Sequence, residues 1–96
     1  AAGQPPGTYE MGGTKVTLSA DGQVRDAVGW WLAGSALTLN QAVANTVKFT
    51  GLPVETVLPM ASTQPADYMA MKTAGRVVAE WDAAASCLRI SQTLDA

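Results

Sequence analysis

The chain carries few residues that could perform acid–base, nucleophilic or metal chemistry. Its 96 residues include no histidine, the commonest general base and the commonest metal ligand in proteins. Without histidine, neither a Ser–His nor a Cys–His nucleophile pair can form. A metal site could draw only on the 8 carboxylates and Cys87, which are spread along the sequence. We therefore predict that the isolated chain has no catalytic residue and no metal-binding residue of its own.

Two local patterns come closest to a reactive site. Glu80 and Asp82 are the nearest pair of carboxylates, and alternate residues share a face in a strand but are both solvated in a turn. A solvated turn is the favoured interpretation. Cys87 precedes Leu88 and is interpreted as a small core residue rather than a nucleophile, because no electropositive neighbour is evident that could lower its pKa.

Composition excludes several classes of function. The net charge is −2, and the 6 basic residues are scattered rather than clustered, which argues against nucleic-acid binding. No apolar run approaches the ~20 residues that span a bilayer, so no membrane partner is expected. A single cysteine fits a reducing compartment, and the cytoplasm is the expected location. Hydrophobic residues reach 48% and charged residues only 15%, which indicates either an alanine-rich, tightly packed domain or apolar surface that another body covers.

The elements that must position any site begin with short strands. Alternating residues at 9–11 and 15–18 flank Gly12-Gly13-Thr14, which is typical of a hairpin. A second turn at Ala20-Asp21-Gly22 leads to residues 23–25, so a three-stranded meander is predicted. Residues 26–35 lose the alternation and are expected to form a loop. Within it, Trp30 and Trp31 are expected to pack on a neighbouring helix or chain.

Helical periodicity follows the loop. Thr38 and Gln41 fit a capping box, Leu39, Val43 and Val47 would form an apolar face, and Gly51 would end the helix. A second helix is predicted from Pro53, with Val54, Val57, Leu58 and Ala61 on one face and Pro59 as an interruption. A third is predicted from Pro65 to about residue 73. Strands at 76–78 and 86–90 are expected around a turn at 80–82.

These elements predict an α+β fragment: an N-terminal β-hairpin or meander, two to three helices, and C-terminal strands. The chain is expected to be one fragment. Within it, residues 1–31 would be loop and hairpin, 32–74 loop and helices, and 75–96 closing strands.

Several spaced motifs resemble one enzyme family. The segment Leu32-Ala33-Gly34-Ser35-Ala36-Leu37-Thr38 leads into a predicted helix, and Gly51-Leu52-Pro53 and Met60–Ala66 follow in order. Gly7-Thr8-Tyr9 lies upstream and Gly75-Arg76-Val77 downstream. Together these motifs resemble the C-terminal segment of N-acetylglucosamine-6-phosphate deacetylases of the amidohydrolase superfamily. The resemblance runs from about residue 2 to 78 and weakens beyond it.

The resemblance implies a metal-dependent hydrolase that converts N-acetylglucosamine 6-phosphate to glucosamine 6-phosphate and acetate. The parent would be a (β/α)8 barrel with a β-sandwich domain, its divalent metal, zinc or a similar ion, held by segments before residue 1. This fragment would hold no cofactor. Its family positions would be the substrate-contacting Leu32, Ala33, Gly34 and Ser35. There, glycine lets backbone approach a ligand, and a nearby helix N-terminus favours an anion. The alternative makes Gly34 a loop glycine and Ser35 a helix cap.

Two functions of different classes remain open. The first is part of this deacetylase, inactive in isolation, with an amino-sugar phosphate as the ligand of the parent. The second is a small, non-enzymatic module that self-associates. A homo-oligomer is expected because the predicted apolar helix faces exceed what a chain of 96 residues can cover. Trp30 and Trp31 are the expected contacts between copies.

Overall fold

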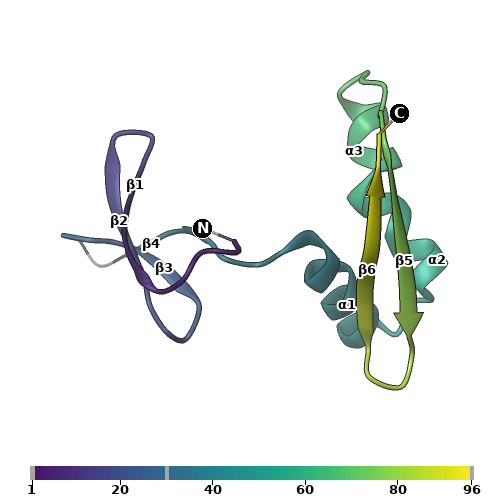
Figure 1. The fold of residues 1–96 in the computed structure, drawn as a ribbon, viewed down its shortest axis with the longest axis horizontal. Helices are drawn as coiled ribbons and strands as arrows, with labels where there is room; N and C mark the ends of the chain where they lie inside the picture. Colours follow the sequence, from purple (N-terminus) through teal and green to yellow (C-terminus); the bar gives the residue numbers. More distant parts are fainter. Residues whose placement is uncertain (1, 30, 96) are drawn as a thin grey trace. The chain divides into compact units, whose positions relative to one another are not determined.

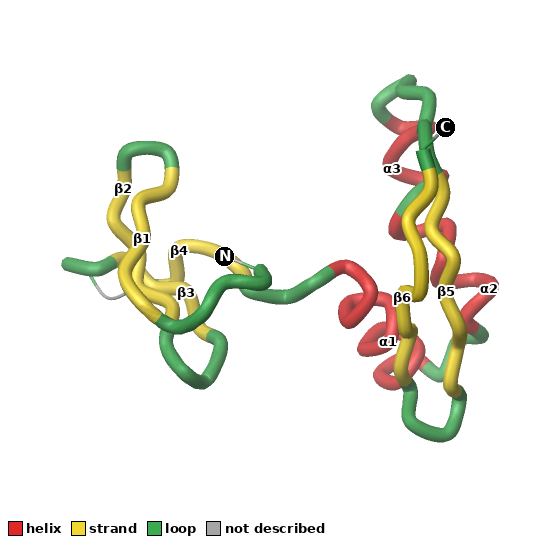
Figure 2. The backbone as a smooth tube through the Cα atoms, in the orientation of Figure 1, coloured by secondary structure: helices red, strands yellow, loops and turns green. Residues whose placement is uncertain are grey.

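The computed structural model describes residues 2–29 and 31–95, and the chain divides into two compact units, Ala1–Thr38 and Leu39–Ala96. The first unit is a β-sheet and the second combines helices with a β-hairpin, as the ribbon and the tube show (Figure 1, Figure 2). The predicted α+β composition is therefore confirmed, with two antiparallel sheets. The barrel and sandwich of the proposed parent stay an expectation.

The first unit is a four-stranded antiparallel sheet in the order β1-β2-β3-β4. Its strands are β1 (Gly7–Met11), β2 (Thr14–Leu18), β3 (Gln23–Asp26) and β4 (Leu32–Ser35). Glycines at positive φ make the turns possible: Gly12 and Gly13 between β1 and β2, and Gly22 between β2 and β3. The meander predicted for the first three strands is confirmed.

The core of this sheet is small and lies on its central strands. Val16, Leu18 and Val24 are at most 5% exposed, and Tyr9 and Ala36 pack against them. Strand alternation explains why these three residues are the buried ones, because residues 16, 18 and 24 project to one face of the sheet while residues 17 and 25 project to the other. The exposed edge strand β4 is therefore held by its pairing with β3.

The prediction of a loop over residues 26–35 is wrong for its second half. Asp26 reorganises the chain: its Oδ1 accepts hydrogen bonds from the N–H groups of Val28 and Gly29 at 2.9 and 2.7 Å. This side-chain bonding closes a turn that the sequence alternation does not show. The returning segment then pairs with β3 as β4, so the meander has one strand more than expected.

The second unit begins with α1 (Leu39–Thr50), followed by α2 (Val54–Val57), the 3₁₀ helix η1 (Leu58–Ala61) and α3 (Thr63–Tyr68). The strands β5 (Arg76–Asp82) and β6 (Cys87–Leu94) close it as an antiparallel hairpin. The core joins the two kinds of element. Val43, Val57 and Leu88 are buried there, with Val47, Val54, Ala61 and Trp81 half-buried against them.

The end of α1 agrees with the sequence prediction more closely than its start does. Gly51 has φ +72°, and its N–H donates to the carbonyl of Val47 at 2.9 Å, which confirms the predicted glycine stop. At the start, the Gln41 amide donates to Asn45 Oδ1 at 2.9 Å, so it reaches forward along the helix rather than back to Thr38.

The helices after α1 were both predicted to contain or start at a proline. Pro59 ends the α-helical bonding, as predicted, and the chain continues as the 3₁₀ turn η1 because a proline has no N–H to donate. The prediction of a helix from Pro65 to about residue 73 is wrong at both ends. The helix α3 starts at Thr63 and stops at Tyr68, and Ala70 follows with φ +55°.

Two side-chain hydrogen bonds fasten α1 to the β5–β6 hairpin. Asn40 Nδ2 donates to the Leu88 carbonyl at 3.1 Å, and Ser86 Oγ donates to the Ala44 carbonyl at 3.1 Å. These half-buried bonds lie beside the buried Leu88 and fix the hairpin against one face of the helix. Leu39, which was expected on that face, is 63% exposed.

The predicted turn at residues 80–82 is wrong. Glu80 and Asp82 belong to β5, where alternation places them on one face, and the turn lies at residues 83–86. Asp82 stabilises that turn, since its Oδ1 accepts the Ala85 N–H at 3.1 Å. Arg89 Nη2 also lies 3.6 Å from Asp82 Oδ2 across the hairpin. These contacts give Asp82 a structural role.

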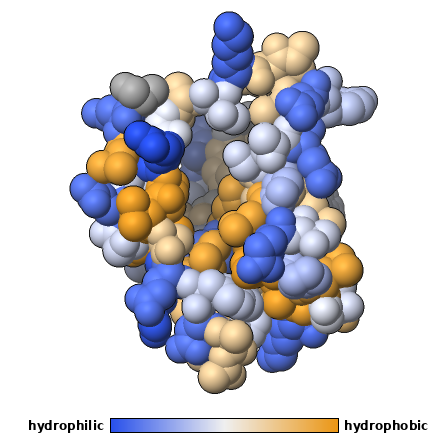
Figure 3. Space-filling model, turned by 90° about the vertical axis from the view of Figure 1, so that its right-hand side faces the viewer, coloured by the Kyte–Doolittle hydropathy of each residue, from blue (hydrophilic) through white to orange (hydrophobic). Residues whose placement is uncertain are grey.

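Large apolar side chains remain on the surface of the second unit. Phe49 is 77% exposed, Tyr68 89% and Met69 62%. Figure 3 looks toward this unit and shows apolar residues interspersed among polar ones. No helix in the part of the chain that the structure describes is long and apolar enough to cross a membrane.

Candidate functional site

The four residues predicted to contact substrate form the edge strand β4. Leu32, Ala33, Gly34 and Ser35 are all exposed, and Leu32 is 64% exposed. Arg25 is paired with Leu32 and Val24 with Gly34, so Ala33 is the extra residue of a β-bulge. A bulge bends the strand and redirects the residues beside it, and bulges recur next to binding sites. The structure thus brings the four residues together on one irregular edge.

Gly34 lies in a strand, so its interpretation as a loop glycine is wrong. A Cβ added at Gly34 would lie 3.6 Å from Cγ1 of Val24, an ordinary van der Waals contact. The neighbouring strand therefore does not by itself require glycine at this position. Close approach of a ligand to the Gly34 backbone stays a prediction.

Ser35 caps a local turn rather than a helix. Its Oγ accepts the N–H of Leu37 at 3.0 Å, and α1 starts only at Leu39. The interpretation of Ser35 as the cap of that helix is therefore wrong. Its hydroxyl instead shapes the chain directly after β4.

A shallow hollow of about 390 Å³ lies along β4. Its lining residues are Gly22, Gln23, Val24, Leu32, Gly34, Ser35, Ala36 and Leu37. None of these side chains ionises, so the hollow can hold a ligand through apolar contact and hydrogen bonds but offers no acid or base. Three of the four predicted site residues line it.

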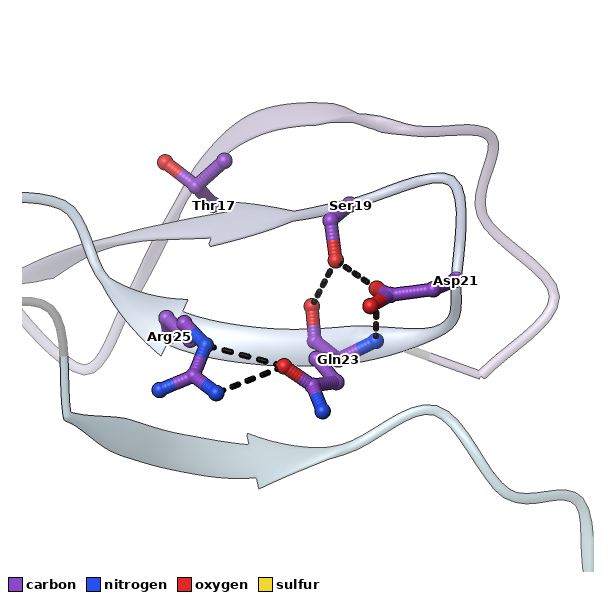
Figure 4. A pocket seen from close by; sticks show the side chains of 5 residues that line it. All are labelled: Thr17, Ser19, Asp21, Gln23 and Arg25. Atoms are coloured by element: carbon purple, nitrogen blue, oxygen red, sulfur yellow. Dashed lines mark hydrogen bonds between the residues drawn. The ribbon is translucent and has the colours of Figure 1, made fainter.

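A second hollow of about 390 Å³ lies on the β2–β3 hairpin (Figure 4). Its lining residues are Thr17, Ser19, Asp21, Gln23 and Arg25. Gln23 lines both hollows, which places them next to each other. Sequence reasoning missed this polar row. The signal was present as polar side chains at every second position across the turn.

Hydrogen bonds order the side chains of this second hollow. Arg25 donates to Oε1 of Gln23 through Nε at 3.0 Å and through Nη2 at 2.6 Å. Ser19 Oγ donates to Asp21 Oδ1, and the Gln23 N–H reaches the same oxygen at 3.3 Å. The hydrogen bond from Ser19, then that from the Gln23 backbone, holds the pKa of Asp21 below its ordinary value of 3.8. Asp21 is therefore a fixed carboxylate rather than a general base.

Of the two tryptophans predicted to pack on a neighbouring helix or chain, the structure describes Trp31. Trp30 lies outside the described residues. The ring of Trp31 lies against Gly29, since a Cβ added at Gly29 would come within 1.6 Å of it, and Trp31 stays 63% exposed. Its packing against a second chain stays a prediction.

The described residues do not fit a metal ion. Within residues 2–29 and 31–95, no three Cys, Asp or Glu side chains come together as ligands. Cys87 is a half-buried thiol at the start of β6. A divalent metal therefore has no ligand set on this part of the chain.

Comparison with known proteins shows which enzymes the sequence resembles. Two relatives come from two strains of Escherichia coli, K12 and O157:H7. Each is 44% identical to this chain over 66 residues, which are 69% of the chain. The relative from strain O157:H7 is named N-acetylgalactosamine-6-phosphate deacetylase. A Lysinibacillus sphaericus protein named N-acetylglucosamine-6-phosphate deacetylase is 33% identical over 83 residues, which are 86% of this chain. No family model and no solved structure matches the chain.

The chain spans only part of these relatives: 38% and 17% of the two Escherichia coli proteins and 21% of the Lysinibacillus sphaericus protein. The similarity nevertheless extends over two thirds or more of this chain, which is consistent with a fragment of such an enzyme. The resemblance indicated by the motifs is confirmed: the chain is homologous to part of the deacetylases of N-acetylgalactosamine 6-phosphate and N-acetylglucosamine 6-phosphate.

Proposed function

We propose that this chain is part of a hydrolase that removes the acetyl group from an N-acetylated hexosamine 6-phosphate and is inactive by itself. The observation that carries the proposal is the sequence similarity to relatives named for this activity, which reaches 86% of the chain. The absence of histidine supports the proposed inactivity of the isolated chain, because general-base and metal chemistry would have to come from other segments of the enzyme.

Within this proposal, β4 contributes substrate binding. Leu32 would supply apolar contact, the bulge at Ala33 would present the strand edge, and Gly34 would allow the ligand to approach the backbone. The hydrolytic metal, zinc or a similar divalent ion, would be held by segments of the parent that this chain does not include. The parent would act in the cytoplasm on amino sugars, without nucleic-acid or membrane partners.

A chimera tests the proposal directly. The chain replaces the homologous segment of the Lysinibacillus sphaericus enzyme, and acetate release from N-acetylglucosamine 6-phosphate and N-acetylgalactosamine 6-phosphate is measured. We expect turnover by the chimera and none by the isolated chain, with or without added zinc. Turnover by the isolated chain that persists through repurification would contradict the proposal, as would a folded chimera without activity.

Variants of the chimera test the role of β4. Gly34→Leu is expected to raise KM or lower kcat/KM more than Gly7→Leu, a matched change at a glycine that also lacks a positive φ. Gly22 is a poorer control because its φ of +84° strains any side chain. Equal effects at positions 34 and 7, after correction for stability, would make β4 merely structural.

A second candidate function is self-association of the isolated chain. The exposed Phe49, Tyr68 and Met69 favour it, because a second copy could cover large apolar side chains that the second unit leaves exposed. We propose that two copies associate through these side chains. Light scattering at micromolar concentration should show a dimer that Phe49→Ser weakens and Thr50→Ser does not. A monomer throughout would contradict this candidate.

A further inference from the structure

We propose that Asp21 and Gly22 form a site of spontaneous isomerisation to isoaspartate, and that Ser19 keeps the reaction slow in the folded chain. Asp21 is the only aspartate in the sequence that precedes glycine, and the other aspartates precede alanine or tyrosine. The pair lies in the exposed turn between β2 and β3 (Figure 4).

The reaction joins the backbone nitrogen of Gly22 to the side-chain carbon Cγ of Asp21. The neutral carboxyl group loses its hydroxyl, which leaves with the amide proton as water, and a cyclic imide remains. Water then opens the ring. Attack at Cγ restores aspartate, whereas attack at the main-chain carbonyl carbon of Asp21 breaks its bond to Gly22 and leaves the chain running through Cγ as isoaspartate. Water is released in the first step and taken up in the second, so no other reactant is needed.

The turn leaves this pair open to the reaction. Gly22 has φ +84°, and a Cβ added there would meet nothing within 4 Å. The attacking nitrogen therefore has no side chain beside it, and the backbone freedom of glycine lets the turn adjust while the ring closes. Asp21 and Gly22 are both exposed, so water reaches the imide from solvent.

Hydrogen bonds oppose the reaction at both of its reacting groups. The Gly22 N–H donates to the Ser19 carbonyl at 3.0 Å, which engages the proton that must leave. Ser19 Oγ donates to Asp21 Oδ1, and the Gln23 N–H reaches the same oxygen at 3.3 Å. These two bonds, with a smaller contribution from the charge of Arg25, hold the pKa of Asp21 below its ordinary value of 3.8. Because the charged carboxylate has no hydroxyl to lose, only a small neutral fraction can react.

Isomerisation would change the candidate site. Isoaspartate adds one carbon to the main chain of a turn closed by the Ser19 N–H to the Gln23 carbonyl and by the Gly22 N–H to the Ser19 carbonyl, each at 3.0 Å. This turn sets the register in which Leu18 opposes Val24 in the core. Gly22, Gln23 and Val24 also line the hollow along β4. A longer main chain at the turn would therefore alter both the core and the hollow.

The test incubates the full 96-residue chain for weeks at neutral pH and physiological temperature. Peptide mapping by liquid chromatography and mass spectrometry locates isoaspartate, which has the mass of aspartate but elutes separately. We expect it at Asp21 and not at the other aspartates. Ser19→Ala should accumulate it about tenfold faster, because the loss of a hydrogen bond to the charged carboxylate raises the neutral fraction by about that factor. The wild-type chain unfolded in urea should react at least as fast as Ser19→Ala.

Thr17→Val is the matched control, since it removes a hydroxyl group of the same hollow from β2, outside the turn, and should leave the rate unchanged. Asp21→Asn gives a second readout with Ser19 in place. Its amide is always neutral, so the ring should close faster, with release of ammonia instead of water.

Two kinds of result would overturn the proposal. Equal rates for Ser19→Ala, Thr17→Val and the wild type, or no faster ring closure in Asp21→Asn, would show that the charge and bonding of the carboxylate do not restrain the reaction. Isoaspartate that forms at Asp26 before Asp21, or none at Asp21 even in urea, would remove the site itself.

Discussion

The backbone N–H of Asp26 donates a hydrogen bond of 2.7 Å to the carbonyl oxygen of Trp31. This backbone bond joins the two ends of the turn between β3 and β4. Within the turn, the Asp26 carboxylate accepts hydrogen bonds from the N–H groups of Val28 and Gly29. One residue thus ends β3 and sets the start of β4. The exposed edge that carries the candidate site depends on it.

The Asp26 turn should be sensitive to acid. Hydrogen bonds from Gly29, then Val28, hold its pKa below the ordinary value of 3.8, so the carboxylate is bound more strongly when charged. A lowered pKa in the folded state contributes stability above pH 3.8 that is lost as the pH falls through the folded value. We expect the amide shifts of Val28 and Gly29 to titrate there.

Asp26→Asn should remove this titration, while Asp95→Asn, near the C-terminus, should leave it in place. An unchanged titration of the Val28 and Gly29 amides in Asp26→Asn would show that another group governs the turn.

Asn40→Ala should destabilise the second unit by about 1 kcal/mol, because it removes the bond to the Leu88 carbonyl beside the core. Gln41→Ala is the control, since its bond to Asn45 is exposed and should contribute less than about 0.5 kcal/mol. Urea unfolding followed by circular dichroism measures both. Equal losses would mean that Asn40 does not fasten the hairpin to α1.

Val57→Ala should cost about 1–3 kcal/mol, because Val57 is 2% exposed and joins α1, α2 and β6 in one cluster. The neighbouring Leu58 is 42% exposed, and Leu58→Ala should cost less despite removing more atoms. Thermal unfolding of the two variants compares them. A larger loss for Leu58→Ala would place the core elsewhere.

Gly51→Ala and Gly34→Ala should differ in stability. Gly51 has φ +72°, where an L-residue costs about 1–2 kcal/mol, so the alanine variant should lose about that much. At Gly34 the new methyl group would meet Val24 at 3.6 Å, an ordinary contact, and the change should be near neutral. Denaturant unfolding measures the free energy of unfolding of both variants. A larger loss of stability for Gly34→Ala than for Gly51→Ala would contradict the packing described for β4.

The sequence by itself determined the local elements with strong chemical signals. Glycines marked the first two turns and the end of α1, because only glycine takes positive φ without strain. Pro59 marked the end of α2, because it has no N–H to donate. The spaced motifs further indicated the similarity to part of the hexosamine-6-phosphate deacetylases.

Tertiary contacts decided the rest. β4 exists because the Asp26 side chain closes a turn and β3 offers a partner, and neither effect appears in the local alternation. Residues 80–82 extend β5 because they pair with β6 and because Trp81 is half-buried against the helical core, which outweighs the turn preference of their polar neighbours. The alignment of Arg25 with Leu32 likewise follows from strand register and a bulge, which are set by pairing across the sheet rather than by either segment alone.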